Sequence, residues 1–286
     1  MLVRPLAEPL GAEIIDLKTD RLSDQGIQRA LRDALFEYLV LIIRDQSLGI
    51  SGQVSLTSIL GTPEIAWDRR SRHPENSHVQ IMRSPIRPAN SPPSASQFWH
   101  TDGSFLEYPP IATVLASIYL PDSGGDTLFI DTRSAYETLP SELAVRVRNK
   151  KLRYSYSHKL QAFQTSRYGS EDYDELLEHP DLSHPLVRRH PVTERGSLYL
   201  DQLCVAGVEN VSDEIGAKLL NDLYSRTLVP DRCYRHQWRN GDLLVWDNPS
   251  LMHRRGENHT GDRLLHRTTA AGPRPEPPHT SGLLDR

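Results

Sequence analysis

The chain has 286 residues, of which 37% are hydrophobic and 24% charged, so it carries enough apolar side chains for a core, and global disorder is excluded. Its 33 Lys and Arg against 37 Asp and Glu give a formal net charge of −4, whereas proteins that neutralise nucleic-acid phosphates are usually basic. Residues 1–14 show no secretory signal, and no apolar run is long enough to span a bilayer. We therefore expect a cytoplasmic protein that binds neither nucleic acid nor membrane.

The first third of the chain predicts two helices around a buried strand. Ile27, Leu31 and Leu35 fall on one face of a helix over 22–38, with Ser23 as its N-cap. The apolar run 40–43 predicts a strand, and 53–60 predicts a second helix that ends at Gly61.

Short strands dominate the rest of the chain. Besides the apolar stretch 111–120, we expect strands over 127–131, 184–190, 197–201, 234–238, 243–247 and 263–270, and helices over 135–147 and 213–228. Many short strands with few helices indicate a β-sandwich or barrel decorated by helices. The Pro- and Ser-rich segment 84–97 is expected to be a mobile loop, the polar segment 150–182 a lid or insertion, and 273–286 a flexible tail.

Two H-x-D pairs raise the question of a metal site. If His100 and Asp102 lie on a strand, their side chains share one face and present an imidazole beside a carboxylate. His253, after a turn at Pro249, could add the third ligand of the two-histidine, one-carboxylate set that suits Fe(II) and O₂ chemistry. The other pair, His179 and Asp181, flanks a proline in an acidic stretch and is expected on a surface loop. Spacing alone leaves open that His100 and His253 are ordinary, hydrogen-bonded histidines.

Two arginines predict an anion site. Arg263 and Arg267 share one face of the predicted strand 263–270, about 13 Å apart at 3.3 Å per residue. Such a face is usually solvent-exposed, but inward-pointing guanidinium groups would require anions, and their planar fork suits carboxylates. Thr127, after the Gly124–Gly125 turn, offers a hydroxyl near the same cavity, although a β-branched strand residue there needs no function.

These motifs together resemble the taurine/2,4-dichlorophenoxyacetate dioxygenase family. The similarity is carried by WHTDGSF, SGGDT, GDLLVWDNPSLMHRR and RLLHRTT in this order, with GAEIIDL and LVLIIRDQ near the N-terminus, and it spans about residues 5–272. It implies a single dioxygenase domain over 1–272 on a double-stranded β-helix, or jelly-roll, core that is mainly β with flanking helices.

The resemblance also implies roles for individual residues. His100, Asp102 and His253 would be the metal ligands and catalytic centre for Fe(II), Thr127 and Arg263 would hold the far carboxylate of 2-oxoglutarate, and Arg267 would bind an acid group of the substrate. With O₂ as the other cosubstrate, the products would be succinate, CO₂ and an oxidised small molecule. Trp246 and Asp247 would be structural, and Ser96 and Gln97 would line the approach to the metal.

One departure from the family narrows the range of substrates that we expect. Taurine enzymes carry a histidine shortly after the turn that matches Gly61, where this chain has residues 64–67, Glu-Ile-Ala-Trp, so taurine itself is not expected. Related halogenases replace the metal carboxylate by a small residue. The presence of Asp102 therefore favours hydroxylation, with desaturation or cyclisation as alternatives. The expected substrate is an acidic molecule such as a carboxylate, sulfonate, phosphonate or amino acid.

Two other function classes use some of the same residues. A zinc hydrolase could use His100, Asp102 and His253, but it would leave Thr127 and both arginines without a shared role. A non-catalytic jelly-roll binding protein would not need all three ligands. The sequence leaves the substrate and the oligomeric state open, and a homo-oligomer is allowed.

Overall fold

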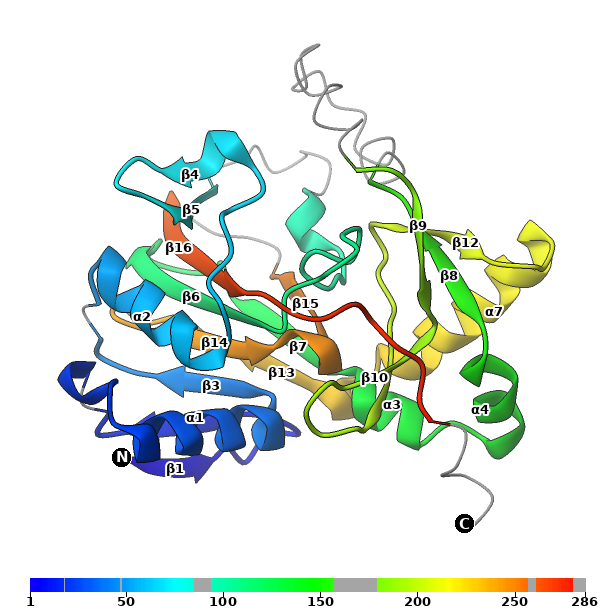
Figure 1. Ribbon diagram of the computed structural model, residues 1–286, viewed down its shortest axis with the longest axis horizontal. Coiled ribbons are helices and arrows are strands. Elements are labelled where there is room, and N and C mark those ends of the chain that lie inside the picture. Colours follow the sequence, from blue (N-terminus) through cyan, green and yellow to red (C-terminus); the bar gives the residue numbers. More distant parts are fainter. Residues whose placement is uncertain (18, 47, 85–93, 157–178, 257–260, 280–286) are drawn as a thin grey trace.

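The computed structural model describes residues 1–286 except 18, 47, 85–93, 157–178, 257–260 and 280–286 (Figure 1). The strands are β1 (Leu2–Pro5), β2 (Ala12–Ile15), β3 (Val40–Ile43), β4 (Arg72–His73), β5 (Asn76–Ser84), β6 (Ala112–Tyr119), β7 (Thr127–Asp131), β8 (Lys151–Tyr154), β9 (Leu182–Pro185), β10 (Val187–Arg189), β11 (Gly196–Leu198), β12 (Val205–Val208), β13 (Cys233–His236), β14 (Leu243–Asp247), β15 (Leu251–Arg255) and β16 (Arg263–Ala270). The α-helices are α1 (Gln25–Tyr38), α2 (Ile50–Leu60), α3 (Thr132–Glu137), α4 (Ser141–Arg148) and α7 (Asp213–Thr227). This confirms the predicted mainly β fold with flanking helices.

Two sheets pack face to face to form the core around the site. The larger has the strand order β1-β2-β3-β14-β6-β16-β5-β4, and the smaller has the order β13-β7-β15. Neighbours in both sheets are antiparallel, except for the parallel pair β2–β3. Side chains from the inner faces of both sheets form one apolar cluster, which includes Phe129 and Leu251 of the smaller sheet and Leu244, Trp246 and Leu265 of the larger.

The central strands of the large sheet are buried on both faces. In β3, Val40 and Ile42 pack between the two sheets, while Leu41 and Ile43 pack under α1 and α2 on the outer face. Strand β14 is buried along its whole length in the same way. A strand covered on both sides reads as a continuous apolar run rather than an alternating one, which is why these strands stand out in the sequence.

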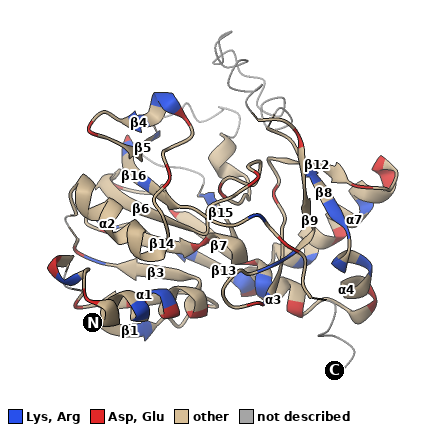
Figure 2. Ribbon diagram, viewed as in Figure 1, with Lys and Arg blue, Asp and Glu red and all other residues tan. Residues whose placement is uncertain are grey.

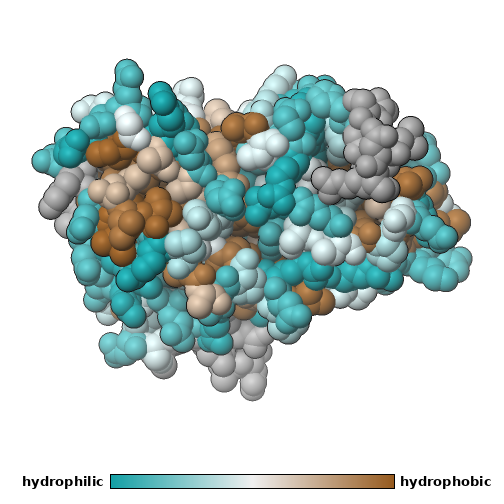
Figure 3. All heavy atoms as spheres, turned by 90° about the horizontal axis from the view of Figure 1, so that it is seen from below, coloured by the Kyte–Doolittle hydropathy of each residue, from teal (hydrophilic) through white to brown (hydrophobic). Residues whose placement is uncertain are grey.

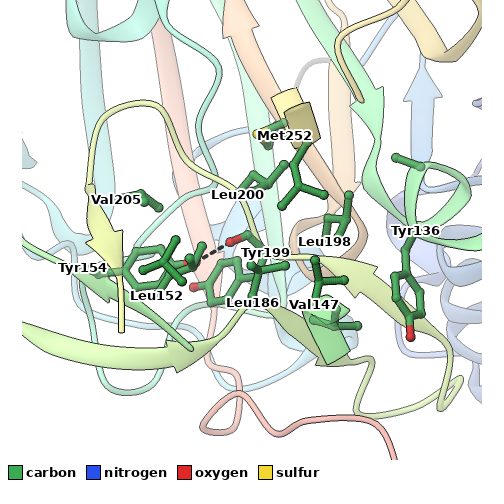
Figure 4. Close-up of a cluster of buried hydrophobic side chains, with 14 of the residues drawn as sticks. Tyr136, Val147, Leu152, Tyr154, Leu186, Leu198, Tyr199, Leu200, Val205 and Met252 are labelled. Atoms are coloured by element: carbon green, nitrogen blue, oxygen red, sulfur yellow. Dashed lines mark hydrogen bonds between the residues drawn. The ribbon is translucent and has the colours of Figure 1, made fainter. Parts of the chain in front are cut away.

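A second cluster of apolar side chains lies beside the two facing sheets. It is built on the small sheets β12-β8-β9 and β10-β11, with α3, α4 and α7 around them (Figure 1). Its centre holds Tyr154 and Tyr199, and the Tyr154 hydroxyl donates to the Tyr199 carbonyl (Figure 4). Met252, next to His253 on β15, packs into the same cluster. The cluster therefore supports one wall of the site.

The surface of the molecule is polar and mixed in charge. Acidic and basic residues alternate along elements such as α1 and α7 (Figure 2), and the face in Figure 3 shows hydrophobic patches separated by hydrophilic residues. Within the residues that the structure describes, no helix has the length and apolarity needed to cross a bilayer.

Several predicted element boundaries are wrong, for identifiable reasons. The helix expected over 135–147 is two helices, α3 and α4, because Pro140 interrupts the chain between them. Helix α1 begins at Gln25, and Asp24 rather than Ser23 caps it by accepting from the Gly26 and Ile27 amides. The strand expected over 184–190 is divided at Leu186 into β9 and β10, which belong to different sheets.

Two segments expected to be irregular are partly ordered. The start of 150–182 is strand β8, paired with β9 and β12, whereas 157–178, the centre of the expected lid, lies outside the described residues, as does most of the 84–97 loop. In the tail, the Arg189 amide donates to the Glu276 carbonyl at 2.7 Å, and their side chains form an ion pair. The tail is therefore packed against β10 up to this point, not frayed from residue 273; residues 280–286 are not described.

Candidate active site

His100 and His253 lie side by side at the smaller sheet, where their backbones form a bridge. His253 follows the turn at Pro249, as expected, and lies on β15, a strand that the sequence did not predict. The His100 amide donates to the His253 carbonyl at 3.0 Å, and the His253 amide donates to the His100 carbonyl at 2.8 Å. This reciprocal bridge brings the two imidazole rings to 4.3 Å between centroids.

Asp102 is placed by a side chain from the neighbouring turn rather than by a strand. Of the predicted H-x-D strand, only His100 forms a bridge, and the chain turns at Asp102. The Asn248 side chain accepts from the Asp102 amide at 3.1 Å and donates to the Asp102 and Pro110 carbonyls, both at 2.9 Å. Asn248 is fully buried, so it fixes the backbone of Asp102 where regular pairing is missing. Trp246 and Asp247, just before it, are core residues, as expected.

Both oxygens of the Asp102 carboxylate are engaged. Oδ2 accepts from the Thr113 hydroxyl at 2.8 Å, and Oδ1 accepts from Nη1 of Arg267 at 2.7 Å. Oδ1 also lies 3.8 Å from Nε2 of His253. Burial alone would raise the pKa of Asp102, but the Arg267 guanidinium is the largest of the influences that lower it well below its usual range. The carboxylate is therefore ionised in neutral solution.

Each imidazole has a ring nitrogen that can face a metal. Nδ1 of His100 lies 2.8 Å from the Phe98 carbonyl, which can only accept, so Nδ1 carries a proton and Nε2 is the nitrogen left to face a metal. Burial, followed by the charge of His100, lowers the pKa of His253 to about 3. His253 is therefore neutral at physiological pH.

These three side chains could hold one metal ion. One ligand atom from each of His100, Asp102 and His253 lies within 4.8 Å of the others, close enough for a shared ion after modest side-chain adjustment. Two imidazoles and one carboxylate form the facial set that suits Fe(II) and leaves coordination positions open. The donor chemistry of this chain thus fits the metal expected from the sequence.

The Thr127 hydroxyl and the Arg263 guanidinium meet near this centre. The Thr127 hydroxyl accepts from the Trp238 indole at 3.0 Å and from Nη2 of Arg263 at 3.4 Å. Arg263 is only 7% exposed, and burial, followed by the charge of Arg255, lowers its pKa to about 9. Among the described residues no carboxylate lies within ion-pair distance of Arg263. A buried guanidinium in this state calls for an anionic ligand.

Arg267 is held against the metal centre. Its Nε and Nη2 both donate to Oε1 of Gln80, and Nη1 donates to Asp102. Gln80 in turn donates to the Ser71 hydroxyl at 2.8 Å. Three of the five N–H groups of the guanidinium are thus engaged, and one on each terminal nitrogen stays available to a ligand. Arg267 therefore points inward, which is the less usual of the two orientations that the strand pattern left open.

A cavity of about 160 Å³ opens between Arg267 and an aromatic wall. Trp67 and Phe105 line the cavity, and Tyr156 packs against both to complete this aromatic wall, with ring centroids 4.6–5.7 Å apart. His179 packs against the wall at 5.1 Å from Phe105. It lies outside helices and strands and is followed by the exposed residues Pro180 and Asp181, so the pair is on a surface loop, as expected, although the imidazole contacts the wall.

The two residues expected to line the approach to the metal behave differently. Ser96 lines the cavity. Oε1 of Gln97 instead accepts from the Ser94 amide at 2.7 Å, so this side chain caps its own 3₁₀ turn.

Sequence reasoning missed the residues that hold the site from behind. Thr113 and Gln80 lie in strands where a single polar residue carries no recognisable pattern. Asn248 was visible in the WDN motif but had no assigned partner, because the 146 positions between it and Asp102 are closed only by folding. Trp67 was noted as a departure from the family, but its contacts with Phe105 and Tyr156 require the tertiary structure.

Comparison with known proteins agrees with this geometry. The model of the family "Taurine catabolism dioxygenase TauD, TfdA family" matches residues 2–269. The chain is 28% identical to the alpha-ketoglutarate-dependent sulfate ester dioxygenase of Pseudomonas putida, covering 94% of this chain and 89% of that protein. It is 29% identical to the (S)-phenoxypropionate/alpha-ketoglutarate-dioxygenase of Sphingobium herbicidovorans, covering 88% of each.

A solved structure shares the fold over nearly the whole chain. The crystal structure of AAD-2 in complex with Mn(II) and N-oxalylglycine superposes with a TM-score of 0.81 at 25% identity, covering 97% of this chain and 100% of that one. The jelly-roll core expected from the sequence is thereby confirmed. The chain belongs to the TauD/TfdA family and is a dioxygenase that uses Fe(II), 2-oxoglutarate and O₂.

Proposed function

We propose that this enzyme hydroxylates an unactivated C–H bond of a small or medium-sized acidic molecule, with His100, Asp102 and His253 as the Fe(II) ligands. Bound Fe(II) would couple the oxidative decarboxylation of 2-oxoglutarate to oxidation of the substrate, releasing succinate and CO₂. The observation that carries the proposal is the inward-facing Arg267, whose Nη1 lies 2.7 Å from Asp102 and whose remaining N–H groups border the cavity.

The pair of Thr127 and Arg263 supports the cosubstrate assignment. The buried positive charge of Arg263 fits the far carboxylate of 2-oxoglutarate, which it can bind through charge-assisted hydrogen bonds that are stronger than neutral ones. The Trp238 indole, which donates to the Thr127 hydroxyl, holds that oxygen in place.

The residues that line the cavity also indicate the chemistry of the substrate. Its acid group would bind Arg267, and its apolar body would lie against Trp67 and Phe105 (the latter 4% exposed). Holding both ends of the substrate places one C–H bond over the metal and excludes others, which is the main contribution a protein makes to such chemistry. Relatives named for a sulfate ester and a phenoxypropionate support an acid with an apolar part.

A panel of matched substrates tests the proposal. Carboxylates, sulfonates, phosphonates and amino acids are each compared with a neutral analogue, and succinate is measured with Fe(II), 2-oxoglutarate and O₂. We expect substrate-dependent succinate above background for acids alone, with one ¹⁸O atom from ¹⁸O₂ in the organic product. Equal turnover of the neutral analogues would contradict the role of Arg267, and a product without ¹⁸O but with a new double bond or ring would favour desaturation or cyclisation.

The metal ligands are tested by alanine variants with a matched control. His100→Ala, Asp102→Ala and His253→Ala should each abolish 2-oxoglutarate turnover, because each removes one of three protein ligands. His279→Ala is the control, since that side chain is 66% exposed and forms its ion pair with the surface residue Glu194. A ligand variant with wild-type succinate production would remove that residue from the metal centre.

A further inference from the structure

A second arginine lies beside the hydrogen-bonded pair of Thr127 and Arg263. Arg255 follows His253 by two positions on β15, so both side chains are on the face that lines the site. Across the sheet, Arg255 pairs directly with Thr127 of β7. Directly opposite residues of an antiparallel pair have Cβ atoms about 4.5–5.5 Å apart on the same face. The Arg255 side chain therefore begins next to the Thr127 hydroxyl.

Burial brings the two arginines into electrostatic contact. Arg255 is 8% exposed and Arg263 7%, and the charge of Arg255 is, after burial, the largest cause that lowers the pKa of Arg263. The nearby Asp126 carboxylate is engaged by Arg235 at 2.5 Å. Two guanidinium groups that are this deeply buried and close enough to affect each other repel, and a carboxylate bound between them would be attracted by both.

The direction of Arg255 distinguishes it from its neighbour. Arg254 points to the other face of β15, where its guanidinium lies 5.3 Å from the centre of the Trp99 ring. Nη2 of Arg255 donates to the Ser94 hydroxyl at 2.8 Å, and Ser94 precedes the 3₁₀ turn whose Ala95 and Ser96 line the substrate cavity. Arg255 thus lies between Thr127 and the rim of the substrate cavity.

We infer that Arg255 is a second cosubstrate-binding arginine, which engages the far carboxylate of 2-oxoglutarate together with Arg263 and Thr127. The inference rests on the proposed function of this site. It gives the dicarboxylate two cations instead of one, so Arg255 should increase the preference of the enzyme for a five-carbon oxo acid with a second carboxylate over one without.

Calorimetric titration of the Mn(II)-loaded protein tests this without turnover. The ligands are 2-oxoglutarate and 2-oxopentanoate, which has the same five-carbon chain but a methyl group in place of the second carboxylate. We expect Arg255→Gln to weaken 2-oxoglutarate binding by at least tenfold and to leave 2-oxopentanoate binding unchanged. Arg254→Gln, the matched control, should change neither, and Arg255→Lys, which keeps the charge, should recover part of the affinity.

The outcomes separate the inference from the function on which it rests. If the wild-type protein does not bind 2-oxoglutarate, the proposed cosubstrate site is wrong. If it binds and Arg255→Gln binds equally well, the function stands and the inference is overturned. An equal loss for both ligands in Arg255→Gln and Arg255→Lys would show that Arg255 supports the structure of the site instead, which also overturns the inference.

Discussion

Replacing Thr113 by valine should weaken the metal centre although Thr113 is not a ligand. Valine has nearly the same shape as threonine but cannot donate to Oδ2 of Asp102. The hydrogen bond is 2.8 Å long, with Thr113 0% and Asp102 5% exposed, so water cannot replace it. Its loss leaves a buried, ionised oxygen without this donor and frees the carboxylate to rotate away from the orientation that places Oδ1 toward His253.

The structure allows two magnitudes to be estimated. A hydrogen bond to a charged group contributes about 1.5–3 kcal/mol, and with an unfolding entropy near 2.1 cal/mol/K per residue, a loss of about 2 kcal/mol lowers the Tm by about 3 °C in a chain of this length. Mutation of a residue that orients a metal ligand typically weakens metal binding by about 10- to 100-fold. We therefore expect Thr113→Val to lower the Tm by a few degrees and to weaken Mn(II) binding within this range.

Scanning calorimetry and Mn(II) titration measure the two effects, with controls that the chain provides. Thr113→Ser keeps the hydroxyl and should restore most of the Mn(II) affinity. Thr227, equally buried on α7, donates to the Leu223 carbonyl at 2.7 Å, so Thr227→Val should lower the Tm without changing Mn(II) affinity. If Thr113→Val binds Mn(II) as tightly as Thr227→Val does, the reasoning is refuted.

Three further predictions follow from other parts of the site and core. Arg263→Gln should raise the Kd for 2-oxoglutarate at least 30-fold, since truncating one partner of a buried charge pair costs about 2–5 kcal/mol, and Arg263→Lys should recover only part because lysine lacks the planar fork; an unchanged Kd in calorimetry would move this role to another residue. Phe105→Ala should raise the KM for the acidic substrate but leave 2-oxoglutarate binding unchanged, and an equal effect on both would show that the aromatic wall is not a substrate surface. Burial lowers the pKa of His184 to about 4. The contribution of the neutral side chain to the free energy of unfolding is therefore complete above pH 6.5 and is lost as the pH falls toward 4, on the order of 3 kcal/mol. His184→Gln should flatten the pH dependence of urea unfolding in this window, and an unaltered profile would contradict the assignment.

The strands that sequence patterns predicted best are those whose burial is simplest. The bounds of β3, β7, β14 and β16 agree with the predicted ranges, because these strands are rich in apolar residues or stand between clear turn residues. Strand β15 was missed because its inner face carries His253 and Arg255, so that a functional strand lacks the apolar alternation by which strands are recognised.

The residues of the candidate site likewise divide into those that the sequence could predict and those that it could not. His100, Asp102 and His253 were visible because they belong to local motifs that the family shares, and the structure brings them together. The aromatic wall was not, because Trp67 and Tyr156 are 89 positions apart in the sequence, and nothing local indicates that their rings meet. Long-range contacts of this kind arise from the packing of whole elements, which no short window contains.

The reciprocal bridge between His100 and His253 has a consequence for how the site can come apart. Each amide proton of this pair is held by the carbonyl of the other histidine, so neither can exchange with solvent deuterium until the loop that carries His100 separates from β15. Both amides should therefore exchange together, at a rate set by the opening of that single contact. The bridge makes the two imidazoles one mechanical unit: a fluctuation that removes one histidine from the centre also releases the backbone of the other.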